Sequence, residues 1–283
     1  MPELPEVETV RRGIDSLVVG RLITRVEVGR ERTVRRTSRE ALIDGASGTR
    51  IVATRRHGKY LSCDLDSGEA IMIHLRMSGR VLVVDAGTPR PPHTHVVFHL
   101  ESTSRLPDGE MWFVDPRTFG EVVVYDPSRP SDLVPELARL GPDPLEAGFT
   151  AEVLAARLRG KRGNLKATLL DQAVVAGIGN IYADEICHRA RLSPHRVAGS
   201  LRRDTLERLH ASIVGVLAEA VAAGGSTLED TQYVDAEGNE GWFQLEHRVY
   251  GRAGETCRTC RRTRISRTTL AGRTTCYCRV CQR

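Results

Sequence analysis

The stretch CRTCRRTRISRTTLAGRTTCYCRVC, residues 257–281, decides how the end of this 283-residue chain folds. It contains two CxxC pairs with 17 residues between them, formed by Cys257, Cys260, Cys278 and Cys281. Four thiolates at this spacing predict a closed, tetrahedral structural site for one Zn²⁺ ion. Disulfide bonds are a weaker alternative because they are rare in a reducing cytosol. A redox CxxC site is also weaker, since no βαβ pattern surrounds either pair.

The three other cysteines need a different explanation. Cys276 has the wrong spacing to Cys278 for a metal-binding pair, so we interpret it as a strand neighbour of the ligands. Cys63 and Cys187 are isolated in the sequence, and we expect both to be packing residues.

Positive charge is concentrated in the same region. Residues 240–283 hold ten Arg and three acidic residues, whereas the rest of the chain has a small acidic excess. Such a segment is typical of a contact with nucleic acid, although charge runs are often only solvated surface. The metal-ligand pattern favours the nucleic-acid interpretation here. No long apolar run resembles a leader or a membrane span, so we expect a cytosolic protein with no membrane partner.

The rest of the chain, before the cysteine-rich tail, divides into two parts with different hydrophobic periodicity. A first helix is predicted from Pro5 to about Val18, where apolar residues recur at helical spacing and Gly20 follows as a stop. Short runs such as HVVFHL and GEVVVYD, between about 22 and 125, predict an antiparallel sandwich or barrel-like sheet. A Pro- and acid-rich stretch follows, and helical patterns then begin at Thr150, a candidate N-cap.

The helical part contains a glycine-rich turn. LKATLLDQAVV predicts one helix, AGIG a turn, and NIYADEICHRA a further helix with Asn180 as N-cap. A longer amphipathic helix is predicted to end at Gly224 and Gly225. Glycine-rich backbone that leads into a helix N-terminus suits an anion such as a DNA phosphate, although such elements often only pack together.

Two further groups of residues are candidates for DNA contact. Lys59, in RRHGKYL, is one of three lysines, and a compact charge there suits a phosphate; an ordinary surface cation is the alternative. Met77, Arg117 and Phe119 lie in the fragments HLRMSGR and DPRTFG. Enzymes that move a base out of a duplex need such side chains to fill the space left behind, but each one alone is more often a core or surface residue.

The chain contains, in this order, MPELPEVETVRRG, HGKYL, HLRMSG, DPRTFG, LLDQAVVAGIGNIYADE, GGSTLED, VYGRAG and the two CxxC pairs. Together these motifs resemble bacterial formamidopyrimidine-DNA glycosylase, in the family shared with endonuclease VIII. The resemblance implies an α+β fold: a leading helix with an antiparallel β-sandwich, a linker, and a helix–two-turns–helix domain with a β-hairpin zinc finger. It implies a catalytic domain over 1–130, a linker over 131–148, a DNA-binding domain with the lesion-capping loop over 149–240, and a zinc finger over 241–283.

The resemblance also implies roles for the amino-terminal residues. Pro2 matches the nucleophile that attacks C1′ of the damaged nucleotide, provided that Met1 is removed. An α-amine has a pKa of about 8, so a useful fraction of it is unprotonated near neutrality. Glu3 matches the general acid/base, and Glu6 a supporting carboxylate, although a helix-terminus role explains Glu6 nearly as well.

The DNA contacts implied by the resemblance extend along the whole chain. Four residues match the family's phosphate-binding positions: Lys59, His74, Asn180 and Arg273. The position of Lys59 is the one beside the reacting sugar. Met77, Arg117 and Phe119 match the side chains that fill the void, and Tyr182 lies beside the DNA-facing turn. Three positions depart from the family's commonest pattern: Arg76 stands where Gly is frequent, Thr118 where a basic residue is usual, and Cys276 where an aromatic residue is usual.

The function implied is a monomeric bifunctional DNA glycosylase and AP lyase acting on damaged double-stranded DNA in the bacterial cytoplasm, at the nucleoid. It would excise 8-oxoguanine and formamidopyrimidines through a Pro2 Schiff base and then cleave the strand by β/δ-elimination. The nearest alternative is an endonuclease VIII-like enzyme for oxidised pyrimidines. A catalytically silent zinc protein that binds DNA would normally lack Pro2 or Glu3, and a small tautomerase leaves the tail unexplained.

Overall fold

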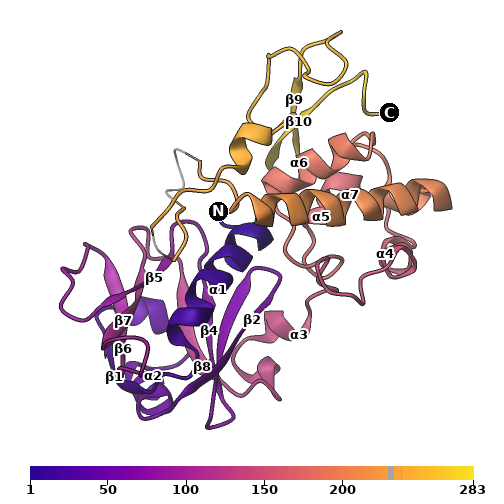
Figure 1. Cartoon of the computed structure of the whole chain (residues 1–283). Helices are drawn as coiled ribbons and strands as arrows, with labels where there is room; N and C mark the ends of the chain where they lie inside the picture. Colours follow the sequence, from indigo (N-terminus) through magenta and orange to yellow (C-terminus); the bar gives the residue numbers. More distant parts are fainter. Residues whose placement is uncertain (229–232, 237) are drawn as a thin grey trace. The chain divides into compact units, whose positions relative to one another are not determined.

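The computed structural model describes residues 1–228, 233–236 and 238–283, and the chain forms two compact units (Figure 1). The amino-terminal unit comprises Met1–Ala138 and Gly224–Trp242. The carboxy-terminal unit comprises Arg139–Ala223 and Phe243–Arg283. Residues 224–242 therefore group with the amino-terminal unit, whereas the sequence-based division placed 224–240 in the helical domain and 241–242 in the zinc finger. They group with this unit because Ser226 and Tyr233 form hydrogen bonds with Glu6 of the first helix.

The amino-terminal unit begins with helix α1 (Leu4–Val18). Its apolar residues Val7, Val10, Ile14 and Val18 are fully buried, as their helical spacing predicts. Pro5 lies in the first turn, where its missing N–H costs no hydrogen bond. The helix ends before Gly20, whose φ of +86° is readily adopted only by glycine. The predicted first helix is confirmed.

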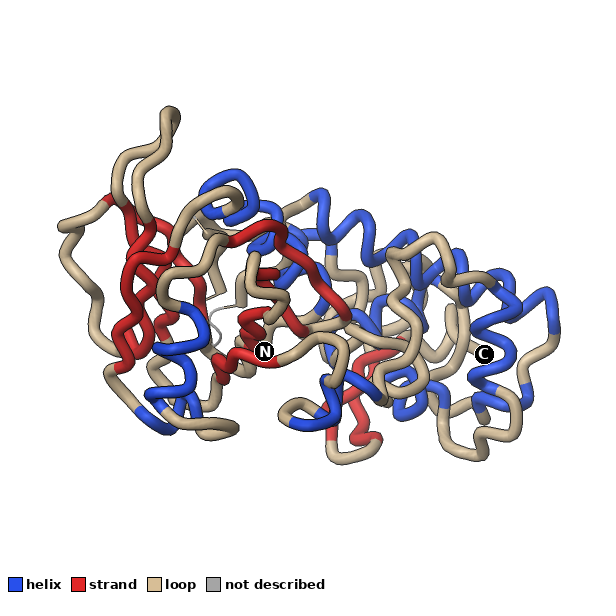
Figure 2. The backbone as a smooth tube through the Cα atoms, turned by 90° about the horizontal axis from the view of Figure 1, so that it is seen from below, coloured by secondary structure: helices blue, strands red, loops and turns tan. Residues whose placement is uncertain are grey.

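Two four-stranded antiparallel sheets form the rest of this unit (Figure 2). One sheet has the order β1 (Ile23–Val28), β6 (Thr94–Leu100), β7 (Gly109–Val114), β5 (Arg80–Asp85). The other has the order β2 (Ile51–His57), β3 (Tyr60–Leu65), β4 (Ala70–His74), β8 (Glu121–Tyr125). Apolar residues from both sheets and from α1 share one buried core. The predicted antiparallel sandwich is therefore confirmed.

Shorter elements cover the ends of the sheets. The 3-10 helix η1 (Glu31–Val34) and helix α2 (Arg39–Ala46) follow β1. After β8 come the 3-10 helix η2 (Pro130–Asp132) and the single-turn helix α3 (Pro135–Ala138). Ser38 caps α2, because its side chain accepts a hydrogen bond from the backbone N–H of Ala41.

The carboxy-terminal unit is mainly helical. Its helices are α4 (Ala151–Leu158), α5 (Leu165–Leu170), α6 (Asn180–Arg189), the 3-10 turn η3 (Ala198–Ser200) and α7 (Arg203–Ala222). Thr150 caps α4 as predicted. The predicted helix over LKATLLDQAVV is too long, because α5 ends at Leu170. The Gln172 side chain then bonds to backbone groups of Leu170, Gly177 and Ile178 and holds the chain in a turn.

One capping prediction in this unit is wrong. Gly179, and not Asn180, is the N-cap of α6, and Asn180 is its first helical residue. The Gly179 backbone is extended, with φ −128° and ψ −159°, and needs no side-chain cap to begin the helix. As a result the Asn180 side chain is not used for capping.

The chain ends in a hairpin of strands β9 (Ser266–Leu270) and β10 (Arg273–Tyr277), preceded by the 3-10 helix η4 (Phe243–Glu246). Ala271 and Gly272 form the two-residue turn, and both have positive φ, as expected for the tight turn of a hairpin. Cys276 lies on β10, as predicted. Cys63 and Cys187 are fully buried, which agrees with packing roles. None of the helices among the described residues is long and apolar enough to cross a membrane.

Candidate active site and nucleic-acid interface

The start of α1 places two buried carboxylates beside Pro2. Glu3 and Glu6 are 2% and 1% exposed, and Pro2 is buried as well. They form a capping box, in which the backbone N–H of Glu3 donates to Glu6 Oε2 at 2.8 Å and the Glu3 side chain accepts from the first turn. The helix itself thus fixes both acids within one turn of the candidate nucleophile.

Glu6 also holds the segment that follows α7. Its Oε1 accepts the backbone N–H of Ser226 at 2.8 Å, and its backbone carbonyl accepts from the Tyr233 hydroxyl at 3.3 Å. Gly225 has a φ of +79°, and a Cβ there would lie 2.9 Å from Glu6 Oε1, so a glycine is required. These contacts explain why residues 224–242 belong to the amino-terminal unit. The part of the predicted lesion-capping loop at 229–232 and 237 lies outside the described residues.

Lys59 lies at the tight turn between β2 and β3 and is 7% exposed. The preceding Arg56 donates to the Gly58 carbonyl at 3.2 Å and to Glu8 of α1 at 3.1 Å. Burial alone would raise the pKa of Glu8, but the surrounding Arg11, Arg12 and Arg56 outweigh it and lower that pKa to about 2. Glu8 therefore ties the Lys59 turn to the helix that follows Pro2.

His74 ends strand β4 and is 5% exposed, with its ring edge-on to Tyr60. Burial, with the nearby Arg76 and Lys59 cations, holds the pKa of His74 well below its usual value. Its Nδ1 accepts the backbone N–H of Arg76 at 3.1 Å, so the proton of the neutral ring belongs on Nε2. A neutral imidazole with an Nε2–H donor can bind a phosphate oxygen.

The loops with the candidate void-filling residues are joined by one buried carboxylate. Asp115 accepts the Ser78 hydroxyl from the first loop, and the backbone N–H groups of Arg117 and Gly120 from the second. Met77 and Phe119 are nevertheless 37% and 39% exposed, unusual for large apolar side chains on fixed loops. The Arg117 guanidinium lies 5.5 Å from the centre of the Phe119 ring.

The two candidates on α6, Asn180 and Tyr182, have different surroundings. The Asn180 side-chain oxygen is buried and has no hydrogen-bond partner in the described part of the chain. Tyr182 is fully buried, with its ring 5.8 Å from that of Phe243. The structure thus places Tyr182 behind the turn as a packing residue, and not on a surface where it could touch DNA.

Arg273 is exposed at the start of β10, and this strand is held to α6 by a buried ion pair. Lys166 and Asp184 are fully inaccessible, 2.8 Å apart between Nζ and Oδ1. Lys166 donates to the Thr274 carbonyl and Asp184 accepts the backbone N–H of Cys276, each at 2.8 Å. Burial raises the pKa of Asp184, and the Lys166 ammonium opposes that rise.

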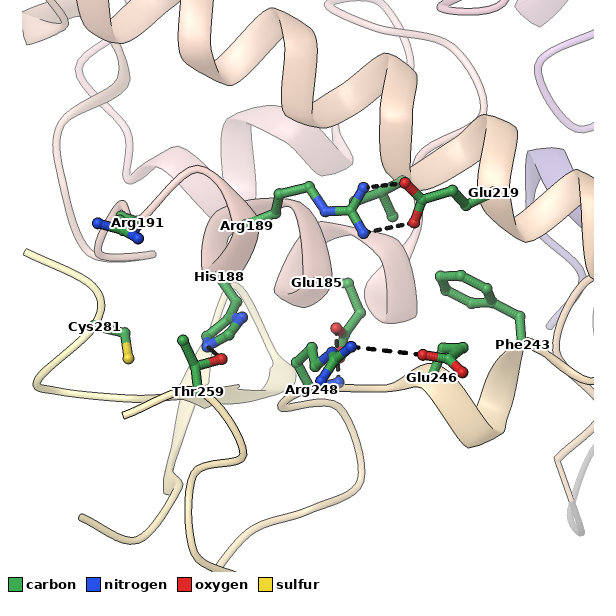
Figure 3. Close-up of a pocket in the computed structure, with 11 residues that line it drawn as sticks. Glu185, His188, Arg189, Arg191, Glu219, Phe243, Glu246, Arg248, Thr259 and Cys281 are labelled. Atoms are coloured by element: carbon green, nitrogen blue, oxygen red, sulfur yellow. Dashed lines mark hydrogen bonds and ion pairs between the residues drawn. The ribbon is translucent and has the colours of Figure 1, made fainter. Parts of the chain in front are cut away.

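Glu185, the next residue, holds the chain entering the hairpin. It accepts three consecutive backbone N–H groups, of Arg248, Val249 and Tyr250, at 2.8–2.9 Å. Figure 3 shows Glu185 beside Arg248. Sequence reasoning missed Asp184, Glu185 and Lys166. The available signal was two adjacent acids within a helix of mostly apolar neighbours, a place where charges are buried only when paired.

The predicted metal ligands come together. The four ligand sulfurs lie within 4.8 Å of one another and belong to Cys257, Cys260, Cys278 and Cys281. Two Sγ–Sγ distances are 3.8 and 3.6 Å. Four sulfurs at about 2.3 Å from a central Zn²⁺ would lie about 3.8 Å apart, so the residues fit a tetrahedral ion. Cys276 is not part of the cluster, which agrees with its interpretation as a strand neighbour.

This fold and these sites define a DNA-repair class: one unit is a helix-led β-sandwich, and the other is a helical domain with a four-cysteine finger. Family models confirm it. The formamidopyrimidine-DNA glycosylase N-terminal domain matches residues 1–122, and the H2TH domain of the same enzymes matches residues 140–232. The chain belongs to the formamidopyrimidine-DNA glycosylase family.

Individual relatives agree with this assignment. The chain is 42% identical over 283 residues to formamidopyrimidine-DNA glycosylase of Carboxydothermus hydrogenoformans and 44% identical over 284 residues to that of Geobacillus kaustophilus, each covering 100% of both chains. The MutM (Fpg) structure of Thermus thermophilus has a TM-score of 0.87 and 40% identity, covering 99% of this chain and 98% of that one. A Lactococcus lactis Fpg mutant bound to Fapy-dG-containing DNA has a TM-score of 0.88 and 33% identity, covering 99% of each chain.

Proposed function

We propose that this protein excises oxidised purines, chiefly 8-oxoguanine and formamidopyrimidines, from duplex DNA and then cleaves the strand at the resulting abasic site. The observation that carries the proposal is the buried capping box that holds Glu3 and Glu6 next to Pro2. Fpg of Lactococcus lactis has been crystallised with abasic-site DNA, which supports the choice of substrate class.

The reaction begins at the Pro2 nitrogen. Removal of Met1 frees this nitrogen, which attacks C1′ of the damaged nucleotide as the bond to the base breaks. Glu3 donates a proton that assists opening of the sugar ring. The secondary amine then forms an iminium ion, which stays cationic without a proton and withdraws electrons from the sugar. That electron withdrawal acidifies the C2′ proton and then the C4′ proton, which pass to the Glu3 carboxylate as the 3′ phosphate and then the 5′ phosphate leave in the β- and δ-eliminations.

The remaining site residues bind DNA in this proposal. Phosphates of the lesion strand are held by Lys59, His74, Asn180 and Arg273. Met77, Arg117 and Phe119 fill the space that the extruded nucleotide leaves, because their exposed side chains are carried on loops fixed by Asp115. Tyr182 supports the turn from behind.

The four-cysteine cluster holds one Zn²⁺ ion in this proposal. The ion supplies structure and no reaction chemistry, since four thiolates leave no open position for a substrate. Its role is to keep the hairpin that bears Arg273 folded. The protein acts as a monomer.

A panel of duplexes tests the lesion class. Duplexes with 8-oxoguanine, a formamidopyrimidine, an oxidised pyrimidine or a plain abasic site are incubated with the protein, and base release and strand cleavage are measured separately. Faster release of the oxidised purines supports the proposal. Faster release of the oxidised pyrimidine identifies an endonuclease VIII-like enzyme instead, and tight binding without any release identifies a silent DNA-binding protein.

A further inference from the structure

A second basic segment lies far from the carboxy-terminal tail. Residues 30–39, RERTVRRTSR, contain five Arg and one Glu. Acidic residues elsewhere in the same part of the chain cancel the positive charge of this segment when the net charge is summed. In the structure it forms η1 and the start of α2, next to the loop that carries Arg117 and Phe119.

A cavity of about 480 Å³ opens at this segment. Its lining contains three guanidinium groups and two exposed acids, and comprises Glu31, Arg32, Val34, Arg35, Thr37, Ser38, Arg39 and Glu40. The cavity of Figure 3, about 320 Å³, is different, because its three Arg are balanced by three Glu. The cavity at residues 31–40 therefore has an excess of positive charge that the other lacks.

Polar atoms around this cavity lack partners. Thr37 Oγ1 and Arg39 Nε are buried without a hydrogen bond from any described residue, and so is the neighbouring Thr33 Oγ1. The ion pair of Arg39 with Glu31 is long at 3.7 Å, and the Glu31 side chain is 79% exposed. An unpaired buried polar group costs free energy, so a ligand with acceptor atoms would stabilise these groups. A phosphate oxygen satisfies both a hydroxyl and a guanidinium.

The cavity is connected by hydrogen bonds to the void-filling loop. Arg32 donates to the Thr118 carbonyl at 3.1 Å, and Arg35 donates to the carbonyls of Phe119 and Gly120 at 3.1 and 3.3 Å. Arg35 is also bound by the buried carboxylate of Glu121, which fixes its position. The same arginines thus line the cavity and hold the backbone that presents Phe119.

We propose that this cavity binds a phosphate of the DNA backbone, in addition to the phosphates assigned to Lys59, His74, Asn180 and Arg273. Arg39 contacts the phosphate through the exposed end of its guanidinium group, and the Thr37 hydroxyl turns toward the phosphate when it binds. Arg32 and Arg35 connect the bound phosphate to the Phe119 loop. Binding of the duplex at this cavity therefore favours the position in which the Phe119 side chain can enter the DNA. The inference rests on the proposed function, because it assumes a duplex DNA substrate.

The test measures binding of a duplex with a tetrahydrofuran abasic analogue at several salt concentrations. Arg39→Gln is expected to weaken binding about tenfold and to lower the slope of log Kd against log salt by about one, as for the loss of one phosphate contact. Thr37→Val keeps the side-chain shape and is expected to weaken binding about tenfold with the slope unchanged. Arg129→Gln removes an exposed charge elsewhere in the same unit and is expected to change neither quantity.

Thermal unfolding separates binding from folding. Thr37→Val removes an unpaired hydroxyl, so its melting temperature is expected to stay equal to wild type or rise. If wild type binds the duplex and both variants behave like Arg129→Gln, the inference is wrong. If the variants bind weakly as expected but wild type releases no damaged base, the proposed function fails and the phosphate site stands.

Discussion

Buried carboxylates organise both the start of α1 and the attachment of the hairpin of the four-cysteine finger, but over very different distances along the chain. Glu3 and Glu6 bond to each other across three residues, so the first turn of the helix sets the geometry of this pair. Asp184 and Glu185 bond to backbone groups 92 and 63–65 residues away. The difference means that the pairing of the two candidate catalytic carboxylates is local, whereas the proposed hairpin contact with DNA depends on tertiary structure. We therefore expect changes at the start of α1 to impair base release and changes at the hairpin to impair DNA binding, each without the other.

Glu3→Gln gives the largest expected effect. Gln keeps a side-chain oxygen that can accept the hydrogen bond of the capping box, but it cannot donate a proton as a carboxylic acid does. We expect base release to slow by about 10²- to 10⁴-fold, the usual contribution of a general acid, with the melting temperature unchanged. Single-turnover release from 8-oxoguanine DNA and a thermal melt measure the two quantities. A variant that melts earlier and keeps its rate would show that Glu3 is a helix cap alone.

Removal of the metal tests the hairpin at the carboxy-terminal end of the chain. A structural Zn²⁺ ion contributes much of the folding free energy of a small finger, so a chelator should unfold the hairpin. We expect binding of abasic-analogue DNA to weaken about tenfold or more, because the charge-assisted contact of Arg273 is lost. The β-sandwich signal in circular dichroism should persist. Full DNA affinity after confirmed metal loss would mean that the hairpin is held without the ion.

Glu185→Ala tests the long-range attachment directly. The change leaves three buried N–H groups without their acceptor, and we expect the free energy of unfolding of the carboxy-terminal unit to fall by about 4 kcal/mol. Glu219→Ala is the matched control, because that glutamate forms an exposed pair with Arg189, worth at most about 1 kcal/mol. Urea denaturation compares the two. Equal losses would show that the three backbone bonds of Glu185 add no stability.

Glu8 gives the smallest effect and one that depends on pH. Its folded pKa of about 2 lies below the ordinary value of 4.5, so the charged form is favoured by folding. The resulting stability, about 3 kcal/mol at about 1.36 kcal/mol per pKa unit, is present above pH 4.5 and is lost as pH falls toward 2. Stability measured against pH should show this loss in wild type and a shallower one in Glu8→Gln. Identical profiles would contradict the role assigned to Glu8 at the Lys59 turn.

The sequence predicts those features that depend on spacing or local chemistry. The CxxC pairs, the apolar stripe of α1 and the cap at Thr150 each follow from residues a few positions apart. The partners of Asp184 and Glu185 could not be predicted, because they lie far along the chain. Gln172 likewise ends α5 through its side chain, which helical periodicity does not register. The five arginines at 30–39 can be read from the sequence, but the net charge summed over a long range does not show them.

The identity of the nucleophile is the central claim, and borohydride trapping tests it most directly. Wild type is mixed with a duplex containing 8-oxoguanine opposite cytosine, reduced, digested and mapped by peptide mass, with Pro2→Gly and Glu3→Gln for comparison. The account predicts a covalent protein–DNA adduct on Pro2, which also requires that Met1 is absent. Absence of an adduct from protein that binds the duplex and has a verified free Pro2 amine would contradict it.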